Sequence, residues 1–155
     1  MVRILLGAAA VIALAACAST PPGPADQILG KWTCAAEQEG MSVNATTTYD
    51  KNGTTSGVAT VGVQAPGSKI EVTADVISTW GFGADGKLKE TVTSMKVTSA
   101  TMGGQPMGAP MIASMIQPMV DEMVVGQGST STVVFDGATM TSTDEERGAV
   151  TTCKR

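Results

Sequence analysis

The fold class of this chain is decided by the stretch SKIEVTADVISTW, residues 68–80. Apolar side chains recur at every second position, at Ile70, Val72, Ala74 and Val76, with mostly polar residues between them. A period of two places these side chains on one face of a β-strand and their neighbours on the other. The stretch therefore predicts a half-buried strand that ends at Trp80.

Seven further stretches have the pattern of strands, several of them rich in Val or Thr, and glycine-containing turn signals separate most of them. Strands at this spacing, joined by short turns, are typical of an antiparallel β-domain. In the stretch 87–99 the inward positions change parity between Val92 and Met95, which indicates a β-bulge. The seven stretches are residues 31–38, 42–50, 54–63, 87–99, 130–135, 138–143 and 149–154.

The N-terminus has the anatomy of a secretory signal peptide. Arg3 precedes an apolar run at residues 4–14, and Leu-Ala-Ala leads directly to Cys17. Such a run is too short to span a membrane as a mature helix. We predict that residues 1–16 are a lipoprotein signal peptide, after which Cys17 is lipidated. The alternative is an ordinary signal peptide that is followed by a cysteine by chance.

The residues around Cys17 resemble the bacterial lipobox, which implies that this cysteine is lipidated and becomes the new N-terminus. Residues 17–26 then form a proline-rich tether, and residues 27–155 form one domain. Ala18 follows the cysteine where an aspartate would imply retention in the inner membrane. By resemblance to sorted lipoproteins, the protein is expected on the bacterial outer membrane, facing the periplasm, with the membrane as its partner through Cys17.

With Cys17 assigned to lipid, Cys34 and Cys153 are left, and an exported domain with two cysteines favours one disulfide. They lie on the first and last predicted strands, which become neighbours when an eight-stranded up-and-down sheet closes. We therefore predict an all-β fold, an eight-stranded antiparallel meander closing into a small barrel. An open sandwich with the disulfide between its sheets is the alternative.

Charge and composition argue against several functions. The chain has 10 basic and 14 acidic residues, and its basic residues are scattered except for Lys154 and Arg155 at the C-terminus. Nucleic-acid binding needs a basic face, so we expect no nucleic-acid partner. The chain has no histidine, which removes histidine-based catalytic triads and nearly all zinc sites. We predict no enzymatic activity and no cofactor.

Residues 101–127 interrupt the strand pattern between strands 5 and 6, and we predict a helical insertion there. Five methionines recur in it at intervals of four, from Met107 to Met123. Three main interpretations stay open: a helix face packed with flexible side chains, an adaptable apolar lid over a ligand cavity, and a thioether site for Cu(I). Scavenging of oxidants through sulfoxide formation is a weaker fourth. We prefer the first and commit to no metal ligand.

Two motifs resemble lipocalin-like domains. Residues 28–32, Ile-Leu-Gly-Lys-Trp, resemble the L-x-G-x-W opening of that family, and residues 48–54 resemble a T-x-Y-x-x-x-G-T hairpin of small bacterial relatives. The resemblance implies a calycin-type barrel in which Trp32 plugs the closed end. It also implies an apolar ligand or another protein as the partner.

These observations predict a lipid-anchored, non-enzymatic binding protein of the cell envelope that takes a small apolar ligand at the barrel mouth. The alternatives are a protein–protein module, either an inhibitor of proteases or lysozyme or an envelope scaffold, and periplasmic binding of Cu(I). The residues expected to border the mouth and contact the ligand are Trp80, Phe82, Met111, Met115, Met119 and Met123.

Overall fold

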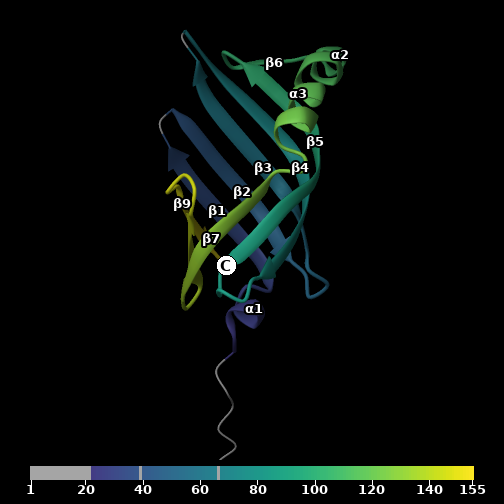
Figure 1. The fold of residues 1–155 in the computed structure, drawn as a ribbon. Helices are drawn as coiled ribbons and strands as arrows, with labels where there is room; N and C mark the ends of the chain where they lie inside the picture. Colours follow the sequence, from purple (N-terminus) through teal and green to yellow (C-terminus); the bar gives the residue numbers. More distant parts are fainter. Residues whose placement is uncertain (1–21, 39, 66) are drawn as a thin grey trace, which may run out of the picture.

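The computed structural model describes residues 22–155 except residues 39 and 66, and most of this chain is antiparallel β-sheet (Figure 1). Eight strands form a closed ring, because the sheet order β4-β3-β2-β1-β9-β8-β7-β5 is completed by pairing of β5 with β4. The predicted fold class is confirmed. The strands of the ring are β1 (Gly30–Gln38), β2 (Met41–Tyr49), β3 (Thr54–Ala65), β4 (Ser68–Phe82), β5 (Leu88–Met102), β7 (Gly128–Asp136), β8 (Thr139–Asp144) and β9 (Val150–Lys154).

The first and last strands meet as expected. Thr33–Ala36 of β1 pair with Thr151–Lys154 of β9, and Cys34 stands directly opposite Cys153. The two cysteines form a disulfide, which confirms the predicted pairing. The bridge links the ladder that closes the ring.

Cross-strand partners from β1 to β5 show which residues face inward. Trp32, Thr47, Gly57, Val76 and Met95 lie opposite one another across five successive strands. Because paired residues project from the same face of a sheet, every second residue from this row points into the ring. The residues between them, many of them Thr, Ser or Lys, form the outer surface.

Two bulges in β5 adjust this alternation. Thr93 and Thr98 have no partner opposite them on β4, and their hydroxyls donate to the carbonyls of Ile77 and Thr73, both at 3.1 Å. The first bulge is the predicted parity change, and it brings Met95 onto the inner face that Val92 already occupies. The second was not predicted.

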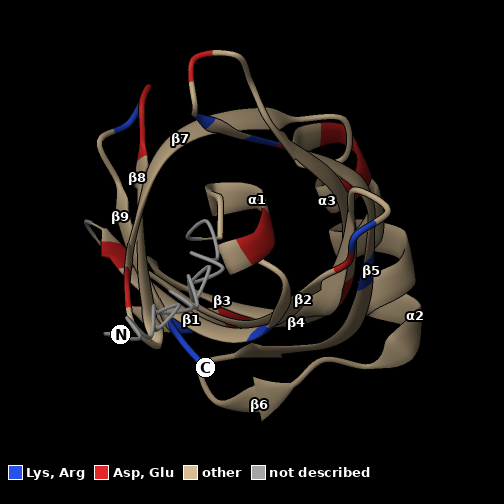
Figure 2. Ribbon diagram, turned by 90° about the horizontal axis from the view of Figure 1, so that it is seen from below, with Lys and Arg blue, Asp and Glu red and all other residues tan. Residues whose placement is uncertain are grey.

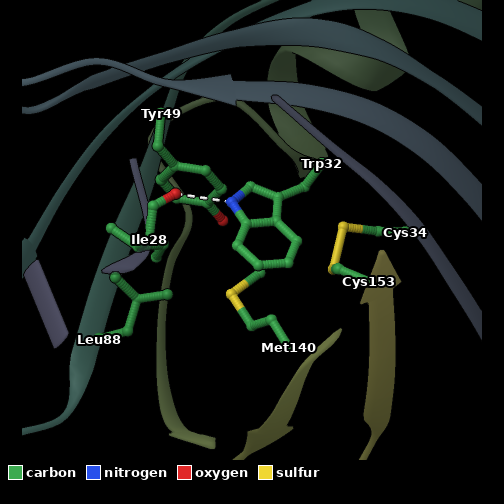
Figure 3. Close-up of a cluster of buried hydrophobic side chains, with 7 residues drawn as sticks. All are labelled: Ile28, Trp32, Cys34, Tyr49, Leu88, Met140 and Cys153. Carbon is green, nitrogen blue, oxygen red and sulfur yellow. Dashed lines mark hydrogen bonds between the residues drawn. A yellow bond between two sulfur atoms is a disulfide. The ribbon is translucent and has the colours of Figure 1, made fainter. Parts of the chain in front are cut away.

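One end of the ring is filled, and we call it the closed end. Its core consists of buried side chains that include Trp32, which is fully buried (Figure 3). The helix α1 (Pro24–Gln27), part of the predicted tether, lies across this end when the ring is viewed along its axis (Figure 2). The Trp32 indole donates to the carbonyl of Ile28 at 2.6 Å, and the Arg155 guanidinium lies 4.5 Å from the ring centre of Trp32. The expectation that Trp32 plugs this end is confirmed.

The opposite end, which we call the rim, carries the insertion. Here β6 (Gln105–Pro106) forms a short hairpin with β5. A helical segment then returns the chain to β7 (Figure 1). It consists of α2 (Ala109–Met111), a π-helical turn η1 (Ile112–Ile116) and α3 (Gln117–Met123).

The helical segment continues the wall where β7 ends. Strand β7 pairs with β5 only over Leu88–Thr91. Beyond that point the Gln117 side chain forms hydrogen bonds with the free edge of β5. It accepts from the Val97 amide and donates to the Met95 carbonyl, both at 2.8 Å. A second, smaller core lies beneath the helix, around Ala74, Met95, Val97 and Val120.

Candidate functional site

A partly open cavity of about 290 Å³ lies inside the ring, between the closed end and the rim. Its base is formed by the Cys34–Cys153 disulfide, Tyr49 and Glu90, which belong to or adjoin the closed-end core. Apolar side chains of β1, β2 and β8 form part of its wall, and hydroxyl groups of β7, β8 and β9 form another part. The apolar residues are Ala36, Met41, Val43 and Met140; the hydroxyl residues are Ser129, Ser131, Ser142 and Thr151.

A second cavity of about 190 Å³ lies beside the first, toward β3 and β4. The space is open because the inner-face residues that line it are small, among them Ala45, Gly57, Ala59 and Ser78. Cys34, Tyr49 and Glu90 line both cavities. The lumen is therefore divided at the Tyr49–Glu90 pair rather than filled.

Tyr49 and Glu90 form the polar centre of this space. The Tyr49 hydroxyl donates to Glu90 Oε1 at 3.0 Å, and the Tyr49 ring stands edge-on to Trp80, with 5.6 Å between ring centroids. Burial, followed by the charge of Glu90, raises the pKa of Tyr49 well above its ordinary range. Tyr49 is therefore a hydrogen-bond donor at any physiological pH.

Glu90 itself is held in a poorly solvated position. Burial raises its pKa, and the hydrogen bond from Tyr49 opposes this in part. No hydrogen bond among the described residues uses the second oxygen, Oε2. That oxygen keeps some accessible surface, because the described residues contain no buried polar side-chain atom without a partner.

The structure does not bring the predicted ligand-binding residues together. Trp80 and Phe82 lie at the closed end, where they pack on its core. The Trp80 indole donates to the carbonyls of Asp50 and Thr54 at 3.1 and 3.0 Å. The predicted methionines lie on the helical segment at the rim. A single mouth bordered by both groups is not formed, because β4 carries Trp80 to the end of the ring opposite the helix.

The methionine stripe does not face the sheet. Met111, Met115, Met119 and Met123 are between 48% and 67% exposed. The residues that pack on the wall are instead Ile112, Ile116, Val120 and Val124, each one position further along the chain. Our preferred interpretation of a packed methionine face is thus replaced by an exposed one. Both series repeat every four residues, so periodicity alone did not distinguish them.

Other predicted features lie outside what the structure describes or stay untested. Cys17 is not among the described residues, so its lipidation stays a prediction. No helix in the described part of the chain is long and apolar enough to cross a membrane. Within residues 22–155, apart from the two gaps, no group of three or more acidic or cysteine side chains is placed to hold a metal ion. A Cu(I) site on the methionines stays a prediction.

Sequence reasoning missed Tyr49 and Glu90 as a pair. The signal for Glu90 was present, because it lies midway between Leu88 and Val92, both predicted to face inward. A charged residue at an inward position of an alternating strand is unusual enough to mark a site. Its partner, 41 residues away, becomes visible only once the strand register is known.

Comparison with known protein families and with curated proteins finds no match. The lipocalin-like resemblance therefore rests on the two sequence motifs.

Proposed function

We propose that this protein is a lipid-anchored, non-enzymatic binding protein of the bacterial cell envelope, and that it takes a small apolar ligand in the lumen of the ring. The cavity of about 290 Å³ carries this proposal. Sites for small molecules are concave and mostly apolar, with a few polar groups that orient the ligand. The cavity has this composition, and its volume corresponds to roughly ten water molecules.

The position of the chain entry fits an anchored protein. Helix α1 enters the domain at the closed end, while the cavity extends from that end to rim residues such as Met41 and Gln38. A lipid on Cys17 would attach the domain by its closed end and leave the rim directed away from the membrane surface. Separately, the buried position of Trp32 at the closed end supports the lipocalin-like resemblance.

Binding of octan-1-ol, a neutral ligand of suitable size, tests the proposal. Ala35 and Ala36 are adjacent on β1, but Ala36 lines the cavity and Ala35 is exposed on the outer face. Isothermal titration calorimetry should give a dissociation constant below about 1 mM for the native protein. Ala36→Phe should weaken binding by about tenfold or more because the ring occupies the cavity, and Ala35→Phe should leave binding unchanged.

The control also defines failure. Equal effects of Ala35→Phe and Ala36→Phe would show that octan-1-ol binds outside the lumen. Absence of binding to the native protein would remove the proposed function.

The exposed methionine stripe favours a protein–protein role as the second candidate. Flexible thioether side chains on a surface can adapt to varied partners, and all four predicted methionines are available to one. Capture of a stoichiometric envelope protein by the native domain tests this role. It should be lost when all four methionines are replaced by Gln, with octan-1-ol binding retained in the same variant.

A further inference from the structure

The geometry points to an amphiphilic ligand whose apolar body occupies the lumen and whose positively charged nitrogen lies against Glu90. This inference rests on the proposed function and specifies the class of ligand, a small organic amine.

The orientation of Glu90 is the first argument. Its cross-strand partners on the inner face are Trp80 of β4 and Ser129 of β7. One carboxylate oxygen is occupied by Tyr49 at 3.0 Å, and the other keeps accessible surface beside the two cavities. Tyr49 thereby fixes the carboxyl group while leaving Oε2 available to a ligand.

The second argument is that Glu90 forms no salt bridge with any cation among the described residues. The salt bridges found among the described residues are Lys69–Glu71 and Lys87–Glu145, so neither involves Glu90. A poorly solvated carboxylate without a counter-ion is costly. Burial raises the pKa of Glu90, as expected for such a group. A bound ammonium would supply the missing charge, whereas a purely apolar ligand would displace water and supply none.

The other charged groups around the cavity favour the same sign of ligand. Besides Glu90, the charged residues that line it are Glu37, Asp144 and Arg147. Three carboxyl groups therefore face one guanidinium, and Tyr49, the remaining titratable group, is neutral. An anionic ligand would meet a negative environment, which opposes its binding.

Three ligands with the same chain length separate the alternatives: octylamine, octan-1-ol and octanoate, each titrated calorimetrically into the native protein at pH 7.5. We expect octylamine to bind about tenfold or more tightly than octan-1-ol, as a charge-assisted hydrogen bond to a partly buried carboxylate allows, and octanoate to bind most weakly. Glu90→Gln should abolish the preference for the amine and retain binding of the alcohol. Asp75→Asn, which removes one carboxylate from the exposed outer face of β4, is the charge-matched control and should retain the preference.

The outcomes distinguish the inference from the proposed function. Binding of octan-1-ol with equal or weaker binding of octylamine would overturn the inference and leave the proposed function standing. Absence of binding by all three ligands would overturn both. Should Glu90→Gln fail to fold, carbon-13 NMR of the native protein gives the answer: the Glu90 carboxyl resonance should shift on adding octylamine and stay in place on adding octan-1-ol. An unmoved resonance with bound octylamine would contradict the inference.

Discussion

The closed end and the rim follow one strand pattern but differ in how that pattern is filled. All five aromatic residues of the described chain, Trp32, Tyr49, Trp80, Phe82 and Phe135, belong to the closed-end cluster. At the rim, Met41, Val63 and Met102 occupy one inward-facing row, yet they are 40–49% exposed. The larger of the two cores thus lies at the closed end, and the alternation that builds the wall does not by itself fill the interior.

The largest expected loss of stability follows from truncating the tryptophan at the closed end. Trp32→Ala removes the fully buried indole that carries contacts with Ile28 and Arg155. Urea unfolding should show a loss of about 3–5 kcal/mol, typical of truncating a buried tryptophan. Met41→Ala, at the rim, should cost less than about 1 kcal/mol because its side chain is already half exposed. Equal losses would contradict the contrast.

Removal of the disulfide is expected to have the next largest effect. Cys34 and Cys153 are separated by 119 residues, and in the chain-entropy model a loop of that length contributes about 4–5 kcal/mol, with about 2–5 kcal/mol usual in practice. The double variant Cys34→Ala/Cys153→Ala should lose stability in this range in guanidinium unfolding. The native protein measured after reduction should lose a similar amount. No change in either measurement would show that the β1–β9 ladder closes the ring without the bridge.

The role of Gln117 sharpens the account of the rim. Gln117→Ala leaves the Val97 amide and the Met95 carbonyl without their side-chain partner, which should cost about 1–3 kcal/mol. Gln117→Glu is the matched control, since its carboxylate still accepts from Val97 but cannot donate to Met95. Hydrogen exchange should be faster at the Val97 amide in Gln117→Ala than in Gln117→Glu. Equal exchange rates would mean that Gln117 does not protect this edge of β5.

The pH dependence of stability tests the environment of Glu90. Its pKa is raised in the folded state, so the folded protein binds the proton more tightly than the unfolded chain. Stability therefore falls as pH rises from the unfolded pKa through the folded one, and is flat above it. Glu90→Gln lacks this loss, so the stability difference between variant and native protein should shift in favour of the variant as pH rises from 3 to 8. A difference that is constant across this range would contradict the pKa direction.

The smallest effect is expected from the methionine stripe. Replacing Met111, Met115, Met119 and Met123 by Leu should change the unfolding free energy by less than about 0.5 kcal/mol for each exposed position. A loss of several kcal/mol would show that these side chains pack in solution. The same variant tests Cu(I) binding, because leucine removes the thioether: retention of Cu(I) by the native protein and its loss in the variant would support that alternative.

The strands and the disulfide were predictable because each depends on local or pairwise signals, whereas the buried position of Trp32 was expected only from the resemblance to lipocalin-like domains. Alternation along residues 68–80 predicts a strand, and two cysteines on the first and last predicted strands favour a fold in which those strands meet. The first bulge was predictable from the change of parity between Val92 and Met95. The separation of Trp80 from the helical segment was not inferred from the sequence: it follows only when the antiparallel strands β4 and β5 are traced together, since Trp80 pairs with Glu90 and the helix follows the other end of β5.

The candidate site was likewise predictable only in part. Two apolar series with a spacing of four, one of methionines and one beginning at Ile112, are equally compatible with a helix face, and only the β5 edge selects between them. Pro24–Asp26, which belong to the predicted tether, lie in a helical turn across the closed end (Figure 2), a local structure that was not predicted from the sequence. The Tyr49–Glu90 contact depends on the register between strands, which cannot be read from the sequence of either strand alone.

The central claim is that the space between the closed end and the rim holds an apolar ligand. Intermolecular nuclear Overhauser effects between octan-1-ol methylene protons and protein methyl groups test it most directly. The account predicts contacts with the methyl groups of Ala36, Val43 and Met140, which line the cavity, and none with Met115. Contacts confined to the helical methionines, or no contacts at saturating octan-1-ol, would contradict it.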